Sequence, residues 1–273
     1  MDFYTINNIK LDIGLDRTYR IIQISDSHAI SLDENQKLDK LNQANNNENA
    51  WYRQKIDFAN YFHERYDEKH HHIPSVLCLE KLIEYINTNR PEIAILTGDI
   101  IDYYSKANYE ILKKMLEKIE VPFIFTCGNH EAPASKFSEL SIDNDVSFQC
   151  VDIDNLRFIG LDDSSKKISY SQLKRLKEKA EDGKKCIICM HIPILTKDNE
   201  KLMEKYDPYF VIDYRNCDEP SKEFIDYVCK NDNITTILCG HAHGYSTNTF
   251  YNNKKKIICS SGIIGFINDI KAN

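Results

Sequence analysis

Residues 93–102 read IAILTGDIID, a short apolar run that is followed by a glycine and two aspartates. The run has the length of a β-strand and is almost continuously apolar, which is typical of a strand covered on both faces. Asp99 and Asp102 follow at the point where such a strand would end. The same order, a strand-length apolar run and then side chains able to bind a metal, recurs along the chain.

Six further runs predict strands: Tyr19–Ser25, Val121–Thr126, Leu156–Leu161, Cys186–Met190, Thr235–Cys239 and Lys256–Ser260. Apolar residues with the spacing of one helix face begin at Leu79, Leu112 and Phe224, between these runs. Strands that alternate with helices predict the α/β class with parallel pairing. The residues on either side of Asp154-Asn155 predict a hairpin instead, so we expect a mixed sheet.

Residues 33 to about 72 interrupt this alternation. They are first polar and rich in asparagine, and then helix-like with several aromatic side chains. We interpret them as a helical insertion within one domain that spans residues 1–273, either a cap over the end of the first strand or a surface excursion. Within it, His70-His71-His72 follows a charged stretch and is interpreted as a solvated surface run.

Composition limits the classes of protein that the chain can represent. Its 35 basic and 42 acidic residues give a net charge of −7, which disfavours a nucleic-acid partner and hence a nuclease. No apolar run approaches the ~18–20 residues of a membrane span. Residues 1–8 lack the features of a secretory signal, and nine cysteines in no repeating frame indicate reduced thiols. We therefore expect a cytoplasmic protein.

Five of the predicted strands are each followed by metal-binding residue types. The blocks are Asp26-Ser27-His28, Gly98-Asp99-Ile100-Ile101-Asp102, Gly128-Asn129-His130-Glu131, His191, and Gly240-His241-Ala242-His243. Open α/β sheets bind ligands at the carboxyl ends of their strands, so we expect these blocks to converge. Each block alone could be an ordinary turn or a structural histidine, but packing gives no reason for all of them to coincide. Together they predict a metal site.

The ligand types narrow the choice of metal. Imidazole with carboxylate and amide oxygen, and without thiolate, suits Zn, Fe, Mn or Co. Seven residues are of these types: Asp26, His28, Asp99, Asn129, His191, His241 and His243. Seven ligands are too many for one tetrahedral ion, whereas two ions about 3.5–4 Å apart that share a carboxylate would use them all.

The five blocks, in this order over residues 26–243, resemble the signature of the calcineurin-like metallophosphoesterase superfamily. The resemblance implies an α/β fold, a four-layer α/β/β/α sandwich with two mixed β-sheets. It implies a first metal held by Asp26, His28 and His243, a second held by Asn129, His191 and His241, and a bridging carboxylate, Asp99. It matches His130 to the non-ligand histidine that meets the leaving-group oxygen, and Asp102 to the carboxylate that orients this histidine.

The expected enzyme is a dinuclear-metal hydrolase of small phosphate esters. Two cations would lower the pKa of bound water and provide a hydroxide for in-line attack on phosphorus. His130 could then protonate the departing alkoxide. The segment from Phe158 resembles the cyclic-nucleotide-phosphodiesterase-like and purple-acid-phosphatase-like branches, so a phosphodiester is favoured.

Two alternatives remain open at this point. One is a phosphomonoesterase, including a protein phosphatase. Tyr103-Tyr104 and Cys127 stand where the protein Ser/Thr phosphatase branch has Arg-Gly and Arg, which argues against phosphoprotein substrates. The other is a non-catalytic scaffold with this fold, and the complete ligand set argues against it.

Overall fold

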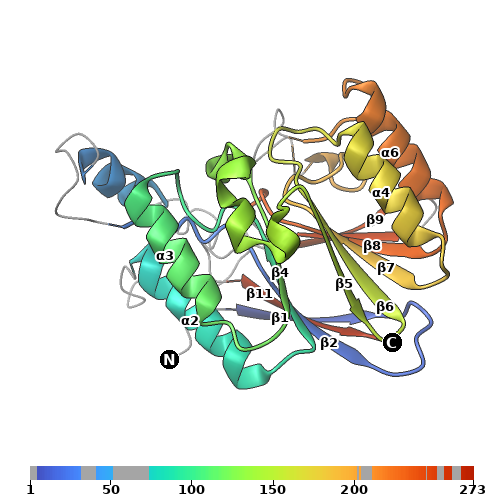
Figure 1. Cartoon of the computed structure of the whole chain (residues 1–273), viewed down its shortest axis with the longest axis horizontal. Helices are drawn as coiled ribbons and strands as arrows, with labels where there is room; N and C mark the ends of the chain where they lie inside the picture. The colour runs from blue at the N-terminus through green and yellow to red at the C-terminus, as the bar shows by residue number, and fades with distance from the viewer. Residues whose placement is uncertain are drawn as a thin grey trace.

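Two mixed β-sheets form the centre of the molecule (Figure 1). The computed structural model describes residues 5–31, 41–51, 74–201, 203, 211–243, 245–250, 255–259 and 266–273. The first sheet has the order β1-β11-β2-β3-β4. Its strands are β1 (Thr5–Leu11), β11 (Phe266–Ala272), β2 (Tyr19–Ile24), β3 (Ile93–Thr97) and β4 (Phe123–Thr126). Strand β11 runs parallel to β1 and antiparallel to β2, and the other pairs are parallel.

The second sheet has the order β5-β6-β7-β8-β10-β9. Its strands are β5 (Phe148–Ile153), β6 (Leu156–Leu161), β7 (Lys185–Cys189), β8 (Ile234–Cys239), β10 (Lys255–Cys259) and β9 (Ser246–Phe250). The predicted hairpin is confirmed as β5 and β6, which pair antiparallel across Asp154-Asn155. Strands β6, β7, β8 and β10 run parallel.

Helices cover the outer faces of both sheets. Helices α2 (Ser75–Asn89) and α3 (Lys106–Glu117) lie on one side of the molecule, and α4 (Tyr170–Ala180) and α6 (Glu219–Lys230) lie on the other (Figure 1). Three short 3-10 helices, η1 (Asn129–Glu131), η2 (Ala134–Leu140) and η3 (Ile142–Asn144), lie between β4 and β5. The predicted four-layer sandwich is therefore confirmed.

Alternating side chains on the central strands explain why these strands are mostly apolar. Ile21 packs between the two sheets, whereas its neighbour Ile22 packs under α2 and α3. On β7, Ile187 lies between the sheets and Ile188 faces the cluster that includes α4 and α6. Both faces of these central strands are buried, so a polar side chain there would lose its water and would need a partner within the protein.

Strands β1, β9 and β11 and helix α4 were not predicted. Strands β1 and β11 carry the related sequences INNIK (residues 6–10) and INDIK (residues 267–271), and they pair in register. Asn268, fully buried on β11, donates to Gln23 Oε1 over 3.0 Å. Gln23 in turn donates to Thr97 Oγ1 and to the Cys239 carbonyl, over 3.0 and 2.8 Å. This chain of amides joins β11 to the ends of β3 and β8.

The predicted insertion is described in part. Residues 41–51 form a helix, while residues 32–40 and 52–73, which include His70-His71-His72, lie outside the described residues. Among the helices of the described residues, none is long and apolar enough to cross a membrane.

Candidate metal centre

The loops that follow β2, β3, β4, β7 and β8 meet where the carboxyl ends of these strands converge. Three of these strands belong to the first sheet and two to the second, so each sheet contributes part of the cluster. The nine predicted site residues all lie within the described residues. Eight of them, all except Asn129, form three overlapping groups, each with ligand atoms within 4.8 Å of one another: Asp26, His28, Asp99 and His243; His28, Asp102 and His130; and Asp99, His191 and His241.

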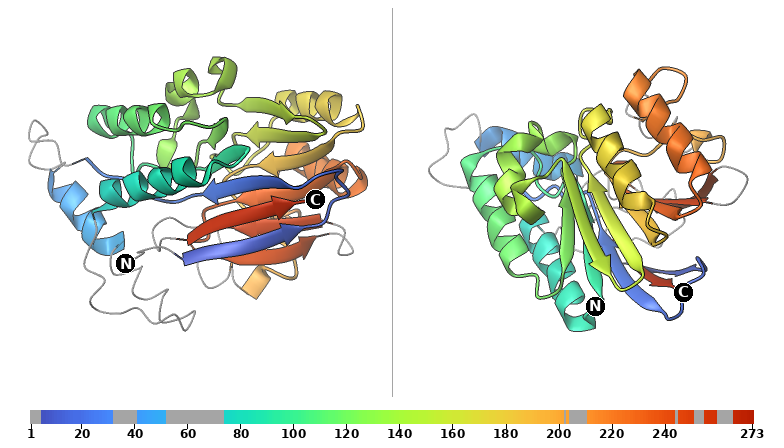
Figure 2. Two further views of the ribbon diagram at one scale, coloured as in Figure 1. Left: turned by 90° about the horizontal axis from the view of Figure 1, so that it is seen from below. Right: turned by 45° about the vertical axis from the view of Figure 1, so that its right-hand side comes forward.

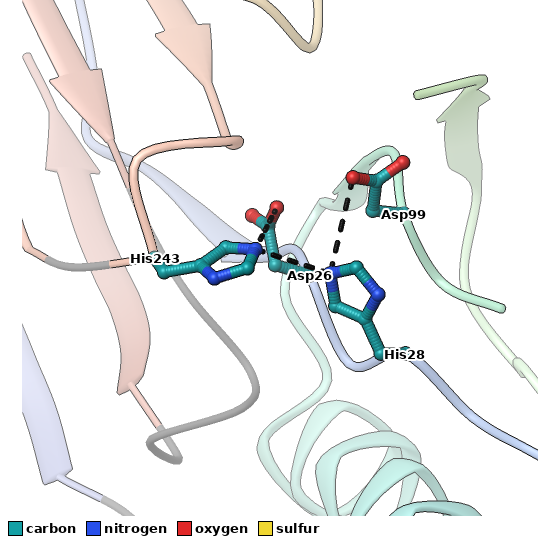
Figure 3. Close-up of side chains that lie close together, drawn as sticks. All are labelled: Asp26, His28, Asp99 and His243. Atoms are coloured by element: carbon teal, nitrogen blue, oxygen red, sulfur yellow. Dashed lines mark hydrogen bonds and ion pairs between the residues drawn. The ribbon is translucent and has the colours of Figure 1, made fainter. Parts of the chain in front are cut away.

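The first group brings two imidazoles and two carboxylates together (Figure 3). His28 Nε2 lies 3.1 Å from His243 Nε2 and 3.8 Å from Asp99 Oδ2. His243 Nε2 lies 3.5 Å from Asp26 Oδ1. His28 Nδ1 donates to the Asp102 carboxylate, so Nε2 of this neutral ring carries a lone pair. Such a lone pair, aimed at a second imidazole and two carboxylates, is an arrangement that a cation would stabilise.

The group of Asp99, His191 and His241 shares Asp99 with the first group. His191 Nε2 lies 3.1 Å from Asp99 Oδ2 and 3.1 Å from Asn129 Oδ1. The ring centroids of His191 and His241 are 5.2 Å apart. The opposite nitrogen, His191 Nδ1, lies 2.7 Å from the Thr97 carbonyl and fixes the ring orientation. One carboxylate oxygen, Asp99 Oδ2, is thus near a histidine of each group.

Burial and neighbouring charges together control the protonation of the cluster. It raises the pKa of the Asp26 carboxyl to about 8, against the attraction of His191 and together with the repulsion of Asp99. It also lowers the pKa of His28 and of His243, so both rings are neutral. Burial opposes ionisation of Asp99 too, but the charge of His191 and its hydrogen bond outweigh this and hold that pKa well below its usual range. Metals bind neutral imidazole and ionised carboxylate, so His28, His243 and Asp99 already have the protonation that a metal requires. Asp26 and His191 would each lose a proton when a metal binds.

The backbone of the site is held in an uncommon conformation. Five of the seven predicted ligands have left-handed backbone angles, with φ between 44° and 64°: Asp26, His28, Asp99, His241 and His243. For residues with a side chain, such angles cost of order 1–3 kcal/mol each and persist only where the surroundings enforce them. The close approach of two loops is part of that enforcement, because a Cβ on Gly128 would lie 2.1 Å from Asp99 Oδ1.

Two buried carboxylates beneath the cluster were not assigned a role from the sequence. Glu131 accepts the backbone N–H groups of Asp99, Ile101 and Gly128, over 2.8, 3.0 and 2.8 Å. Asp163 accepts those of His191 and Ile192, each over 2.8 Å. Glu131 was visible in the block that contains Asn129, but its orientation toward the neighbouring loop is a tertiary feature. Both residues fix the loops that carry the candidate ligands.

His130 lies beside the cluster and is partly exposed. Its Nδ1 donates to the main-chain carbonyl of Asp102 over 2.5 Å, while the Asp102 carboxylate is 3.5 Å from this nitrogen. The same carboxylate is closer to His28 Nδ1, at 3.0 Å. Burial disfavours protonation of His130, but the contact with Asp102 and the charge of Asp99 outweigh it and raise the pKa to about 9.

The sandwich with this histidine and carboxylate cluster at its strand ends is that of a metallophosphoesterase. Residues 19–245 match the calcineurin-like phosphoesterase family, and the chain belongs to this family. The resemblance stated from the five sequence blocks is thus confirmed.

Two curated relatives and two solved structures illustrate the match. The chain is 28% identical over 171 residues to a probable glycerophosphodiester phosphodiesterase of Arcobacter nitrofigilis, covering 58% of this chain and 59% of the relative. It is 28% identical over 192 residues to a cAMP/cGMP dual specificity phosphodiesterase of Mycobacterium tuberculosis, covering 63% of this chain and 55% of the relative. The chain therefore spans less than two thirds of their length.

The solved structures share the fold at low sequence identity. A dimetal phosphatase from Danio rerio superimposes with a TM-score of 0.58 at 14% identity, covering 92% of this chain and 89% of that one. A purple acid phosphatase from yellow lupin gives a TM-score of 0.54 at 12% identity, covering 90% of this chain and 44% of that one.

Proposed function

We propose that the protein is a hydrolase of small phosphate esters that uses two metal ions and favours phosphodiesters. The position of Asp99, near both His28 and His191, is the observation that carries this proposal. The first ion would be held by Asp26, His28 and His243, the second by Asn129, His191 and His241, with Asp99 between them. Zn, Fe, Mn and Co suit these donors.

Bound at this site, two cations would lower the pKa of water and neutralise charge on the phosphoryl oxygens. The chain's own residues would orient them. Asp102 and Thr97 each accept a hydrogen bond from one ligand histidine, His28 and His191 respectively, which leaves Nε2 of that ring for the metal. Glu131 holds the backbone of Asp99.

His130 would act as the general acid. Its Nδ1 is committed to the Asp102 carbonyl, so the proton given to a departing oxygen would come from Nε2. The raised pKa keeps the ring protonated at neutral pH. A cation nearby would lower this pKa and bring it closer to the pH at which the acid works.

Preference for diesters and a cytoplasmic location belong to the same proposal. The two curated relatives described above are named as phosphodiesterases, which supports a diester substrate. The eight cysteines with described side chains are all free thiols, which fits a reducing compartment.

The test is hydrolysis by metal-free protein that has been reconstituted with Mn, Fe, Zn or Co. We expect two ions per chain by elemental analysis, and faster cleavage of bis(nitrophenyl) phosphate than of nitrophenyl phosphate. Asp99→Asn should lose metal and activity. Asp143→Asn is the matched control, because Asp143 shares the left-handed backbone angle but is exposed on the surface. At most one ion per chain after reconstitution, or no cleavage of either ester, would refute the proposal.

A further inference from the structure

The helix of residues 41–51 docks beside the candidate metal centre through one face. Ala44, Asn47, Glu48 and Trp51 are buried or half-buried at helical spacing, while the residues between them are exposed. Figure 2 shows this helix in light blue, on the same side of the molecule as α2 and α3. Three of the four residues on this face are polar or carry an N–H donor, so hydrogen bonds set its position.

Two of these side chains bind Asp102. The Trp51 indole Nε1 donates to Asp102 Oδ1 over 2.6 Å, and Asn47 Nδ2 donates to Asp102 Oδ2 over 2.6 Å. Oδ1 also accepts the hydrogen bond from His28 Nδ1 over 3.0 Å. The Asp102 side chain is fully buried, so its ionised form depends on these three donors, together with the His130 ring 3.5 Å from Oδ1, in place of water.

The indole ring also packs against the candidate ligands. Its centroid lies 4.2 Å from that of His28 at an interplanar angle of 36°, and 5.3 Å from that of His243. The neighbouring turn of the helix is anchored independently. Glu48 accepts hydrogen bonds from Ser75 N and Oγ over 2.6 and 2.8 Å, and Ser75 Oγ accepts one from the backbone N–H of Ile30 over 3.0 Å.

We propose that Trp51 and Asn47 are positioning residues of the metal centre. They hold the Asp102 carboxylate in the orientation in which it fixes the His28 ring with Nε2 toward the first metal. The inserted helix is thus a component of the site. This inference rests on the proposed function, because it assumes that His28 binds a metal. Its physical basis is that a carboxylate behind a ligating histidine sets the tautomer, orientation and basicity of that histidine.

Metal affinity tests this inference without any substrate. Metal-free protein is titrated with Mn²⁺ by calorimetry in four forms: wild type, Trp51→Phe, Asn47→Ala and Asn46→Ala. Trp51→Phe keeps an aromatic ring but removes the N–H donor. Asn46→Ala is the matched control, because Asn46 is the same residue type on the exposed face of the helix.

We expect Trp51→Phe and Asn47→Ala each to weaken one of the two Mn²⁺ sites by about 10-fold, the lower end of the range for such outer residues. The other site and the Asn46→Ala control should be unchanged. In an Asp102→Ala background, Trp51→Phe should cause no further loss, because the residue acts through Asp102. Equal weakening of both sites, or an additive loss in that background, would identify a general structural role and overturn the inference.

Trp51 is the only tryptophan of the chain, so its fluorescence reports the docking directly. Saturating Co²⁺ should quench this emission strongly in wild type and in Asn46→Ala. Emission that Co²⁺ leaves unchanged, in protein shown by calorimetry to bind the ion, would place the helix away from the centre and overturn the inference. A wild-type protein that binds no metal at all would instead refute the proposed function.

Discussion

The close approach of the loops after β3 and β4 can be tested by adding one methyl group. Gly98 has a φ of 81°, and a Cβ at this position would lie 2.6 Å from His191 Nδ1 and 2.7 Å from the backbone nitrogen of Gly128. Gly98→Ala therefore combines a left-handed alanine with a collision against a neighbouring loop. The backbone at Gly98 cannot shift without moving Asp99, so we expect Gly98→Ala both to destabilise the fold and to lose metal.

Two other glycines separate these contributions. Gly14 has a φ of 76° with no heavy atom within 4 Å of a built Cβ, so Gly14→Ala carries backbone strain alone. Gly128 has a φ of −100°, outside the left-handed region, so Gly128→Ala carries the collision with Asp99 alone. The three variants form a set in which Gly98→Ala has both costs.

The magnitudes follow from the geometry. A left-handed alanine costs roughly 1–2 kcal/mol, of which the stiffer unfolded chain returns about 0.4–1 kcal/mol. Gly14→Ala should therefore destabilise by about 1 kcal/mol. Overpacking costs roughly 1–3 kcal/mol, so we expect about 1–2 kcal/mol for Gly128→Ala and about 2–4 kcal/mol for Gly98→Ala.

The assay is urea unfolding of the metal-free proteins, with a constant dependence on denaturant as the check that only stability has changed. Metal content after reconstitution is measured in parallel. It should fall for Gly98→Ala and Gly128→Ala and stay at the wild-type level for Gly14→Ala. If Gly98→Ala is as mild as Gly14→Ala, the loops are not in contact, and this account of the site is wrong.

Two further predictions concern the acid and a surface ion pair. The His130→Ala variant should keep its metal but lose about 10²–10⁴-fold in rate on alkyl esters. The loss should be much smaller on nitrophenyl esters, because their leaving group needs no proton at departure. Equal losses in the steady-state rates on both esters would contradict the role of His130 as the acid. Asp152 accepts hydrogen bonds from Arg157 Nε and Nη2, and chiefly these contacts hold the pKa of its carboxyl well below the usual range. The contribution of Asp152 to stability is therefore present above about pH 4 and is lost as the pH falls below this value. The urea midpoint of Asp152→Asn should be lower than that of wild type at pH 7 and closer to it at pH 3, and a constant difference would contradict this assignment.

The central strands and the candidate ligands were predictable because each depends on local sequence. Strands β3 and β7 are buried on both faces and are therefore almost entirely apolar. Their carboxyl ends meet at one edge of the sandwich, so the residues that follow, such as Asp99 and His191, were expected to converge. The geometry of the described residues brings these two side chains within 3.1 Å.

The unpredicted parts depend on contacts between distant segments. Strands β1 and β11 contain Asn and Asp residues that favour turns, and these side chains find partners in distant segments, as Asn268 does with Gln23 and Asp269 with Arg20. The sequence could not show whether the Asp102 carboxylate lies nearer to His28 or to His130, because the two side-chain contacts differ by only 0.5 Å. The docking of Trp51 depends on how the inserted helix is placed over a loop 51 residues away.

The position of β11 has a consequence for synthesis of the protein on the ribosome. This strand lies between β1 and β2, yet it is translated after every other strand of both sheets. A nascent chain therefore emerges with the edges of β1 and β2 open, and such edges invite pairing with other chains. The loop that carries Asp26 and His28 follows β2 directly, so the metal centre cannot settle until β11 has emerged and paired with β2.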